Sequence, residues 1–354
     1  MKTFIRLCVS AILLCTVLCR AQTGSTSNYH AWWNDQYPNK PLNSPNAKKL
    51  PLITVKGNKF VDPQGSVVLF RGMAIADPDK IEHQGHWNLD FFQHVQQTGA
   101  KVVRIPVHPV AWRERGAQSY LALLDQAVEW CTQLGLYIDI DFHSIGNLET
   151  EVFQDPMYQT SQAEWFNFWR TIANHYQGNN TVVFYELFNE PSNYSDNWGP
   201  VSWDEWKHLN EDLVIMIYSF DRNKIPIVAG FDWAYDLAPL RTSPLNAEGI
   251  AYSVHPYVFK RSKPWEPKWE EDFGFAAERF PIVATEFGFW TPEKPNPATD
   301  GYQQAIVKYL ESRGISWFCW VYDPEWEPAL IKSWDFTPTD SGKFFTDAMH
   351  GKVE

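Results

Sequence analysis

Two glutamates, each at the end of an apolar run, are the residues of this sequence best suited to acid–base chemistry. Glu190 ends the run at residues 182–190 and precedes Pro191, and Glu286 ends the run at residues 281–286. Proline cannot donate a backbone hydrogen bond and biases the residue before it towards an extended conformation, so we expect the first run to be a strand that stops at Glu190. Two carboxyl groups that flank one bond are what the hydrolysis of a glycosidic linkage requires.

Other apolar runs end in side chains that bind ligands or carry protons: Arg104, His143, Asn189, Trp320, and His255 with Tyr257. Taken singly, each could be a strand cap or a core residue. A carboxyl pair that works by acid–base chemistry needs its two members in opposite protonation states. We expect Glu190, beside apolar neighbours, to be the acid, and Glu286 to stay ionised if Arg104 and Tyr257 donate hydrogen bonds to it.

The elements that would position these residues alternate along the chain. The sequence predicts strands at residues 67–73, 101–107, 136–143, 182–190, 226–231, 250–255, 281–286 and 315–320. Helical patterns separate most of them, at residues 88–98, 120–134, 163–176, 203–220, 269–279, 301–312 and 342–349. Eight strands with helices between them predict an α/β fold, a (β/α)8 TIM barrel, here preceded by a small hairpin within residues 52–65. The competing doubly wound sheet would require a glycine-rich phosphate turn that residues 71–74 do not provide.

The chain divides into three predicted parts. Residues 1–21 have the basic start and short apolar core of a signal peptide, residues 22–50 form a spacer or strap, and residues 51–354 form the catalytic barrel. We therefore expect a secreted protein, extracellular or periplasmic. Lipid attachment at Cys19 is disfavoured because Leu18 before it is a poor fit to the small residue that such processing prefers. Cys131 and Cys319 are expected to be buried free thiols.

Composition narrows the partners. The net charge of −12 and the lack of a basic run argue against nucleic acid and anionic membrane surfaces. We expect a monomer without a membrane span, a metal or a cofactor, which binds a polysaccharide or oligosaccharide. Residues 77–86 collect possible metal ligands, but a polar loop is the simpler interpretation. Aromatic rings stack on sugars, and the 18 tryptophans include candidates for substrate binding after strands: Trp87, Trp112, Trp198, Trp233, Trp265, Trp290 and Trp326.

Six segments, in chain order, resemble glycoside hydrolase family 5, a family of retaining β-glycanases that includes cellulases and mannanases. They are residues 103–106 (VRIP), 141–143 (DFH), 188–191 (FNEP), 254–257 (VHPY), 285–288 (TEFG) and 317–320 (WFCW). The resemblance covers roughly residues 50–350. It implies that Glu190 is the acid/base, Glu286 the nucleophile and Asn189 the ligand of the sugar 2-hydroxyl. It further implies that His255 and Tyr257 orient the two glutamates, that Trp320 forms the floor under the reacting sugar, and that Arg104 and His143 complete the hydrogen-bond shell.

The sequence is compatible with several functions. The first expectation is endo-cleavage of β-1,4 linkages in a plant-type glucan. Action on mannan or xyloglucan, an exo-acting β-glycosidase with loops 144–162 and 258–268 closing one end of the cleft, and a non-catalytic sugar-binding barrel are the alternatives. The last is disfavoured because both glutamates are present.

Overall fold

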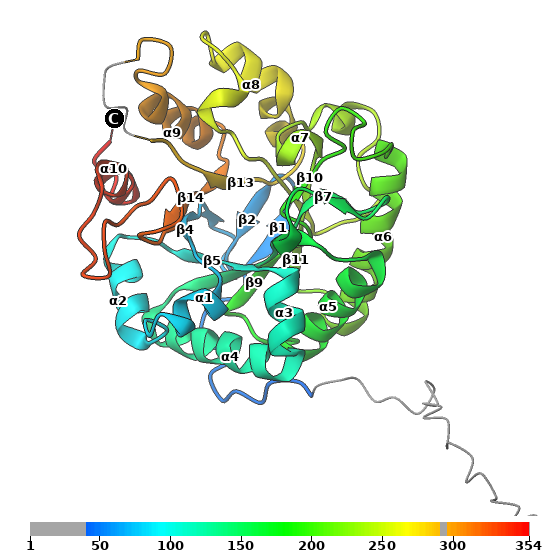
Figure 1. Ribbon diagram of the computed structural model, residues 1–354, viewed down its shortest axis with the longest axis vertical. Coiled ribbons are helices and arrows are strands. Elements are labelled where there is room, and N and C mark those ends of the chain that lie inside the picture. Colours follow the sequence, from blue (N-terminus) through cyan, green and yellow to red (C-terminus); the bar gives the residue numbers. More distant parts are fainter. Residues whose placement is uncertain (1–39, 291–295, 354) are drawn as a thin grey trace, which may run out of the picture. The chain divides into compact units, whose positions relative to one another are not determined.

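Eight parallel strands close into a barrel surrounded by helices (Figure 1). The computed structural model describes residues 40–290 and 296–353. In chain order the barrel strands are β4 (Arg71–Ile75), β5 (Val102–Val107), β6 (Tyr137–Phe142), β9 (Val182–Glu186), β11 (Ile225–Ala229), β12 (Ala251–Ser253), β13 (Ile282–Phe287) and β14 (Ser316–Tyr322). Strand β14 pairs with β4 and closes the ring. The prediction of a (β/α)8 barrel is confirmed.

The hairpin is present, and it covers the amino-terminal end of the barrel. Strands β1 (Thr54–Lys56) and β2 (Lys59–Val61) pair antiparallel, and β3 (Val67–Val68) joins β2. The predicted strand 67–73 is therefore two elements, β3 in the hairpin and β4 in the barrel. The ring of Phe60 packs edge-on to Phe184 with centroids 5.1 Å apart, and Phe70 does so at 5.4 Å. This aromatic plug leaves the carboxyl end of the barrel as the open one.

The helices around the barrel bury their apolar sides against it. They are α1 (Pro78–His83), α2 (Leu89–Gln97), α3 (Pro109–Arg115), α4 (Ala117–Leu134), α5 (Gln162–His175), α6 (Trp203–Phe220), α7 (Phe231–Ala234), α8 (Glu266–Asp272), α9 (Tyr302–Ser312) and α10 (Asp340–Met349). Trp165, Trp169 and Trp206 lie inside α5 and α6 and are at most 2% exposed, as expected for core residues. The predicted helix 269–279 is instead the short α8 followed by a 3₁₀ turn at residues 274–278.

The strand that leads to Glu190 is shorter than predicted. Strand β9 ends at Glu186, and Glu190–Pro191 form a separate strand, β10, which pairs in parallel with β7 (Ile145–Asn147). The prediction that one strand runs as far as Glu190 was wrong, and the N–H groups on either side of Pro191 make the bonds of β10. The Glu190 N–H donates to the carbonyl of Ser144 at 3.1 Å, and the Ser192 N–H donates to Gly146 at 2.9 Å. Strand β8 (Val152–Phe153) completes this small sheet.

The described part of the strap runs along the barrel helices. The N–H of Leu42 donates to the carbonyl of His175 at 2.7 Å, and the N–H of Asn180 donates to that of Ala47 at 2.7 Å. The predicted signal peptide lies outside the described residues. Cys131 and Cys319 are buried free thiols, as expected. Among the described residues, no helix combines the length and the hydropathy that crossing a bilayer requires.

Candidate active site

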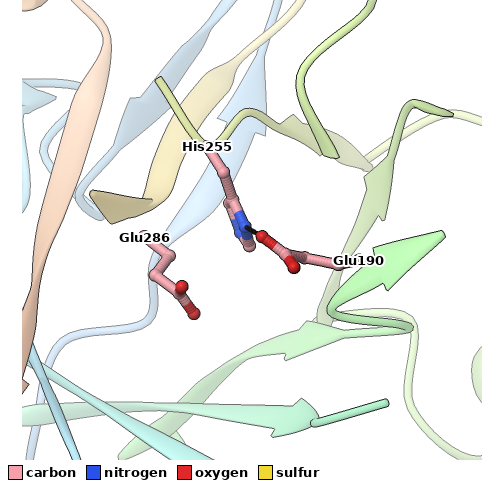
Figure 2. Close-up of side chains that lie close together, drawn as sticks. All are labelled: Glu190, His255 and Glu286. Carbon is pink, nitrogen blue, oxygen red and sulfur yellow. Dashed lines mark hydrogen bonds and ion pairs between the residues drawn. The ribbon is translucent and has the colours of Figure 1, made fainter. Parts of the chain in front are cut away.

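A cavity of about 550 Å³ opens at the carboxyl end of the barrel strands. Its wall includes six of the residues predicted from strand ends, namely His143, Asn189, Glu190, Tyr257, Glu286 and Trp320. Strand β10 supplies Glu190 and strand β13 supplies Glu286, and Figure 2 shows their carboxyl groups turned towards the same space beside the ring of His255. One ligand atom from each of these three residues lies within 4.8 Å of the others.

The imidazole of His255 links Glu190 to a buried polar layer. Its Nδ1 lies 2.9 Å from Oε1 of Glu190, and its Nε2 lies 3.0 Å from the hydroxyl oxygen of Thr285. The Thr285 hydroxyl donates to Glu186 at 2.6 Å, so its oxygen accepts from Nε2–H of His255. Burial lowers the pKa of His255, but Glu286, Glu186 and Glu190 together raise it to about 9. Nδ1 of His255 and Oε1 of Glu190 are therefore joined by a hydrogen bond.

Arg104 is the hub of the buried layer. The guanidinium, fully buried, donates from Nε to Glu186 at 2.6 Å, from Nη1 to Glu286 at 2.8 Å and from Nη2 to the amide oxygen of Asn189 at 2.7 Å. Nη2 also lies 3.0 Å from Asp141. Burial alone would raise the pKa of Glu186, but Arg104 and His255 lower it to about 2. One cation thus holds several acceptors in fixed orientations.

Glu286 receives the two hydrogen bonds predicted for it. Oε2 accepts from Arg104, and Oε1 accepts from the hydroxyl of Tyr257 at 2.8 Å. Burial, together with the nearby Glu190, raises the pKa of Glu286 above its ordinary value. His255, Arg104 and Tyr257 act in the opposite direction and limit this rise. Burial also raises the pKa of Tyr257 well above its usual range, so this phenol remains a donor.

Asn189 carries a donor that nothing in the described chain accepts. Arg104 occupies its side-chain oxygen, which fixes the orientation of the amide. The amide nitrogen is buried without a hydrogen-bond partner among the described residues, and Asn189 lines the cavity. A buried unpaired donor costs free energy unless a ligand satisfies it. The amide N–H of Asn189 is therefore available to donate a hydrogen bond to an oxygen of a ligand in the cavity.

One wall of the cavity is aromatic. The rings of His143 and Trp320 are parallel within 3° with centroids 5.4 Å apart, and Trp326 lies 5.9 Å beyond Trp320. The His143 Nδ1 lies 2.6 Å from Asp141, and burial, with His108, Arg104 and His255, holds the pKa of His143 well below its usual value. A neutral imidazole beside a flat indole suits an uncharged ligand with apolar faces.

Only some of the tryptophans predicted to bind substrate lie at or next to this cavity. Trp233 lines it, Trp198 packs against Trp233, and Trp326 stacks on Trp320. Trp290 is 49% exposed and lies outside the wall formed by the described residues.

Three further tryptophans lie elsewhere, which corrects the prediction that they line the cleft. Trp87 is 8% exposed and packs edge-on to Phe92, and Trp265 is 8% exposed and stacks on Trp269. Trp112 lies in a separate hollow between α3 and α5, edge-on to Phe168. Position after a strand did not distinguish these rings: Trp112 lies within α3, and Trp265 directly precedes α8.

Residues 77–86 are built into the fold rather than gathered around an ion. Asp77 caps α1 and accepts hydrogen bonds from the Tyr120 hydroxyl at 2.6 Å and from the backbone N–H of His108 at 2.9 Å. The group within the described residues that has the geometry for a cation is Glu190, His255 and Glu286. Arg104 donates to that group, and its charge opposes a bound cation.

Some residues of the cavity wall and of the buried polar layer beneath it were not predicted from the sequence. Glu186, Thr285, Asp139 and Asp141 lie in the floor layer, and Gln154, Tyr158, Phe259, Lys260 and Glu327 line the wall. A signal for the floor layer existed. Charged residues inside otherwise apolar strands must face partners, and Asp139 and Asp141 have the spacing of two that puts them on one face.

Comparison with known proteins agrees with this arrangement. Residues 61–325 match the family described as cellulase (glycosyl hydrolase family 5). The chain belongs to this family. A solved β-glucanase from Saccharophagus degradans in complex with cellotetraose is 42% identical, covers 92% of this chain and 100% of that one, and superposes with a TM-score of 0.86.

The curated relatives are more distant. Endoglucanase E-5 of Thermobifida fusca is 24% identical over 290 residues, which cover 79% of this chain and 57% of that protein. An endoglucanase of Paenibacillus polymyxa is 22% identical over 337 residues, covering 81% of this chain and 84% of that protein. The chain therefore spans little more than half the length of the Thermobifida protein.

Proposed function

We propose that this family 5 member is a retaining glycoside hydrolase that cleaves internal β-1,4 linkages of a β-glucan, an endo-β-1,4-glucanase. The observation that carries the proposal is the convergence of Glu190, Glu286 and His255, with one ligand atom of each within 4.8 Å of the others. Retaining enzymes hold their two carboxyl groups about 5–5.5 Å apart, whereas inverting enzymes leave room for a water between them. The close spacing supports double displacement.

In the first step Glu190 protonates the glycosidic oxygen as the bond to the leaving sugar breaks. The proton it uses is shared with Nδ1 of His255, 2.9 Å away. Glu286 attacks the anomeric carbon from the opposite face and forms a covalent glycosyl–enzyme intermediate. Arg104 and Tyr257 each donate to one of its oxygens, which orients the carboxylate and favours its ionised form.

In the second step Glu190 accepts a proton from water, and that water releases the sugar from Glu286 with its β configuration restored. The free amide N–H of Asn189 is placed for the 2-hydroxyl of the reacting sugar, a contact that strengthens in the transition state. The indole of Trp320 forms the floor of the same subsite.

The choice of a glucan rests on similarity. The relative at 42% identity is a β-glucanase bound to cellotetraose, and the curated relatives are endoglucanases. Mannan and xyloglucan remain the alternatives on the same catalytic pair. Secretion is part of the proposal, because a polymeric glucan is met outside the cell. A monomer is expected.

A substrate panel tests the function. The purified mature chain is incubated with carboxymethyl cellulose, barley glucan, mannan, xyloglucan and xylan, and products are separated by size. We expect release of oligosaccharides from the glucans, with a rapid fall in viscosity. Release of a monosaccharide from the first minutes would favour exo action. No hydrolysis of any polymer, with binding retained by both wild type and Glu190→Gln, would reject the enzyme in favour of a sugar-binding barrel.

A further inference from the structure

The turn that carries Trp233 has an unusual backbone. Asp232, Trp233 and Ala234 have φ values of 57°, 56° and 55°, three successive non-glycine residues in the left-handed region. Each such residue costs free energy, so a run of three persists only where its surroundings hold it. Helix α7, which contains the turn, packs against β10, the strand of Glu190. The turn therefore stands directly beside the proposed acid.

Lys260, on the segment that follows the neighbouring barrel strand β12, holds this turn. Its ammonium donates to the carbonyl of Asp232 at 2.5 Å and lies 3.4 Å from a carboxylate oxygen of the same residue. It also lies 5.0 Å from the centroid of the Trp233 indole, within reach of a cation–π interaction. The side chain of Lys260 is only 10% exposed and lines the cavity.

Trp233 is fixed on its other sides as well. Its Nε1–H donates to Oε1 of Gln154 at 3.1 Å, which joins it to the loop after β6. The rings of Tyr194 and Trp198 meet it at centroid distances of 5.6 Å and 5.8 Å. An indole held on several sides that still faces a cavity is a rigid, preorganised surface for a ligand.

The position of Trp233 relative to the two glutamates assigns it a side of the cleft. The proposed mechanism puts the reacting sugar over Glu286, between Asn189 and Trp320 of β14. The leaving sugar must extend past Glu190, which protonates the oxygen between the two. Trp233 stands there, three barrel strands from Trp320 and beside β10.

We propose that Lys260 is a positioning residue for the leaving-group side of the cleft: it fixes the turn at residues 232–234 so that Trp233 presents a platform to the departing sugar. This inference rests on the proposed function. It adds a specificity determinant outside the carboxyl pair, which acts only on substrates that have a sugar beyond the scissile bond. Substrates with a small aryl leaving group depend on the platform less.

The test compares two substrates in variants of the full mature chain. The measurement is the ratio of kcat/KM for cellohexaose to kcat/KM for an aryl β-cellobioside. Lys260→Met keeps the length of the side chain and removes its charge and hydrogen bonds, and we expect the ratio to fall about tenfold, the scale of one partly desolvated cation–π contact and its hydrogen bond. Lys260→Arg is expected to restore most of it.

A matched control exists on the same loop. Lys263 also lies over an indole, 4.8 Å from the centroid of Trp265, and donates to a backbone carbonyl, that of Pro297, but it is outside the cavity wall. Lys263→Met should leave the ratio within about twofold of the wild type. In a Trp233→Ala background the Lys260→Met change should no longer lower the ratio, because its target is gone.

Several results would overturn the inference: an equal loss on both substrates, no loss on either, or a Lys260→Met effect that persists without Trp233. If the wild type cleaves neither substrate, the proposed function fails. The role of Lys260 in positioning Trp233 is then tested by binding alone, in a fluorescence titration with cellohexaose. Affinity about tenfold weaker in Lys260→Met, but not in Lys263→Met, supports it, and equal affinities reject it.

Discussion

Nδ1 of His255 lies 2.9 Å from Oε1 of Glu190, while Nε2 of the same ring faces the Thr285 hydroxyl at 3.0 Å. Because Thr285 donates to Glu186, the ring must donate at Nε2. Nδ1 then either donates to an ionised Glu190 or accepts from a protonated one. The proton proposed for the leaving oxygen therefore lies between these two atoms.

This pairing predicts the pH dependence of both activity and stability. The folded pKa of His255, about 9, is raised above the unfolded value of 6.5. Its contribution to stability is therefore fully present below about pH 6.5 and is lost as the pH rises through about 9. Unfolding by urea at several pH values should show a wild-type advantage over His255→Gln that vanishes on the alkaline side. If catalysis uses the protonated ring, kcat/KM of the wild type should also fall as the pH rises through about 9, and His255→Gln should lack this limb.

Removing the acid should affect substrates according to their leaving groups. Glu190→Gln should lower kcat on β-glucan by about 10²–10⁴-fold, the usual contribution of general acid–base catalysis. An aryl cellobioside with an acidic phenol needs little protonation, so its first step should be affected far less. Steady-state and burst kinetics on both substrates make the comparison. Equal losses on the two would contradict the assignment of Glu190 as acid.

Asn189 should matter most in the transition state. With Arg104 on its oxygen, its free N–H is available for the 2-hydroxyl. Asn189→Ala should lower kcat/KM on an aryl β-cellobioside by about 10²-fold, the scale of one oriented donor to a developing charge. The loss should shrink on the 2-deoxy analogue, which lacks the hydroxyl. A loss of the same size on both would assign Asn189 a structural role instead.

Arg104 should be needed for folding as well as for catalysis. It is fully buried and faces Glu186, Glu286 and Asp141. Arg104→Met leaves these carboxylates without their cation and should lower the free energy of unfolding by about 3–5 kcal/mol, measured by denaturant titration at neutral pH.

Arg113 provides the control for that measurement. It also pairs with a glutamate, Glu164, but the two side chains are 44% and 42% exposed. Arg113→Met should therefore lower the free energy of unfolding by no more than about 1 kcal/mol. Comparable losses in the two variants would mean that burial does not set the importance of Arg104.

The sequence predicted site residues at the ends of strands better than site residues elsewhere. In a barrel the carboxyl ends of all strands meet, so Glu190, Glu286 and His143 could be brought together without knowledge of register. Glu186 was recognisable as a charge in an apolar strand, but its partners were not, because they depend on how β9 is staggered against β6. The prediction that Trp87 and Trp265 line the cleft was wrong for a physical reason. Position after a strand does not decide whether an indole faces the cleft or the core, and both of these side chains are buried. Lys260 acts through a left-handed turn that no sequence pattern in residues 230–235 announces.

The stereochemistry of the first product tests the central claim most directly. Proton NMR of cello-oligosaccharide hydrolysis, recorded before mutarotation, distinguishes the two anomers. Because one ligand atom each of Glu190, Glu286 and His255 lies within 4.8 Å of the others, double displacement is expected, and the β anomer should appear first. Initial appearance of the α anomer would contradict both the assignment of Glu286 as nucleophile and the mechanism built on it.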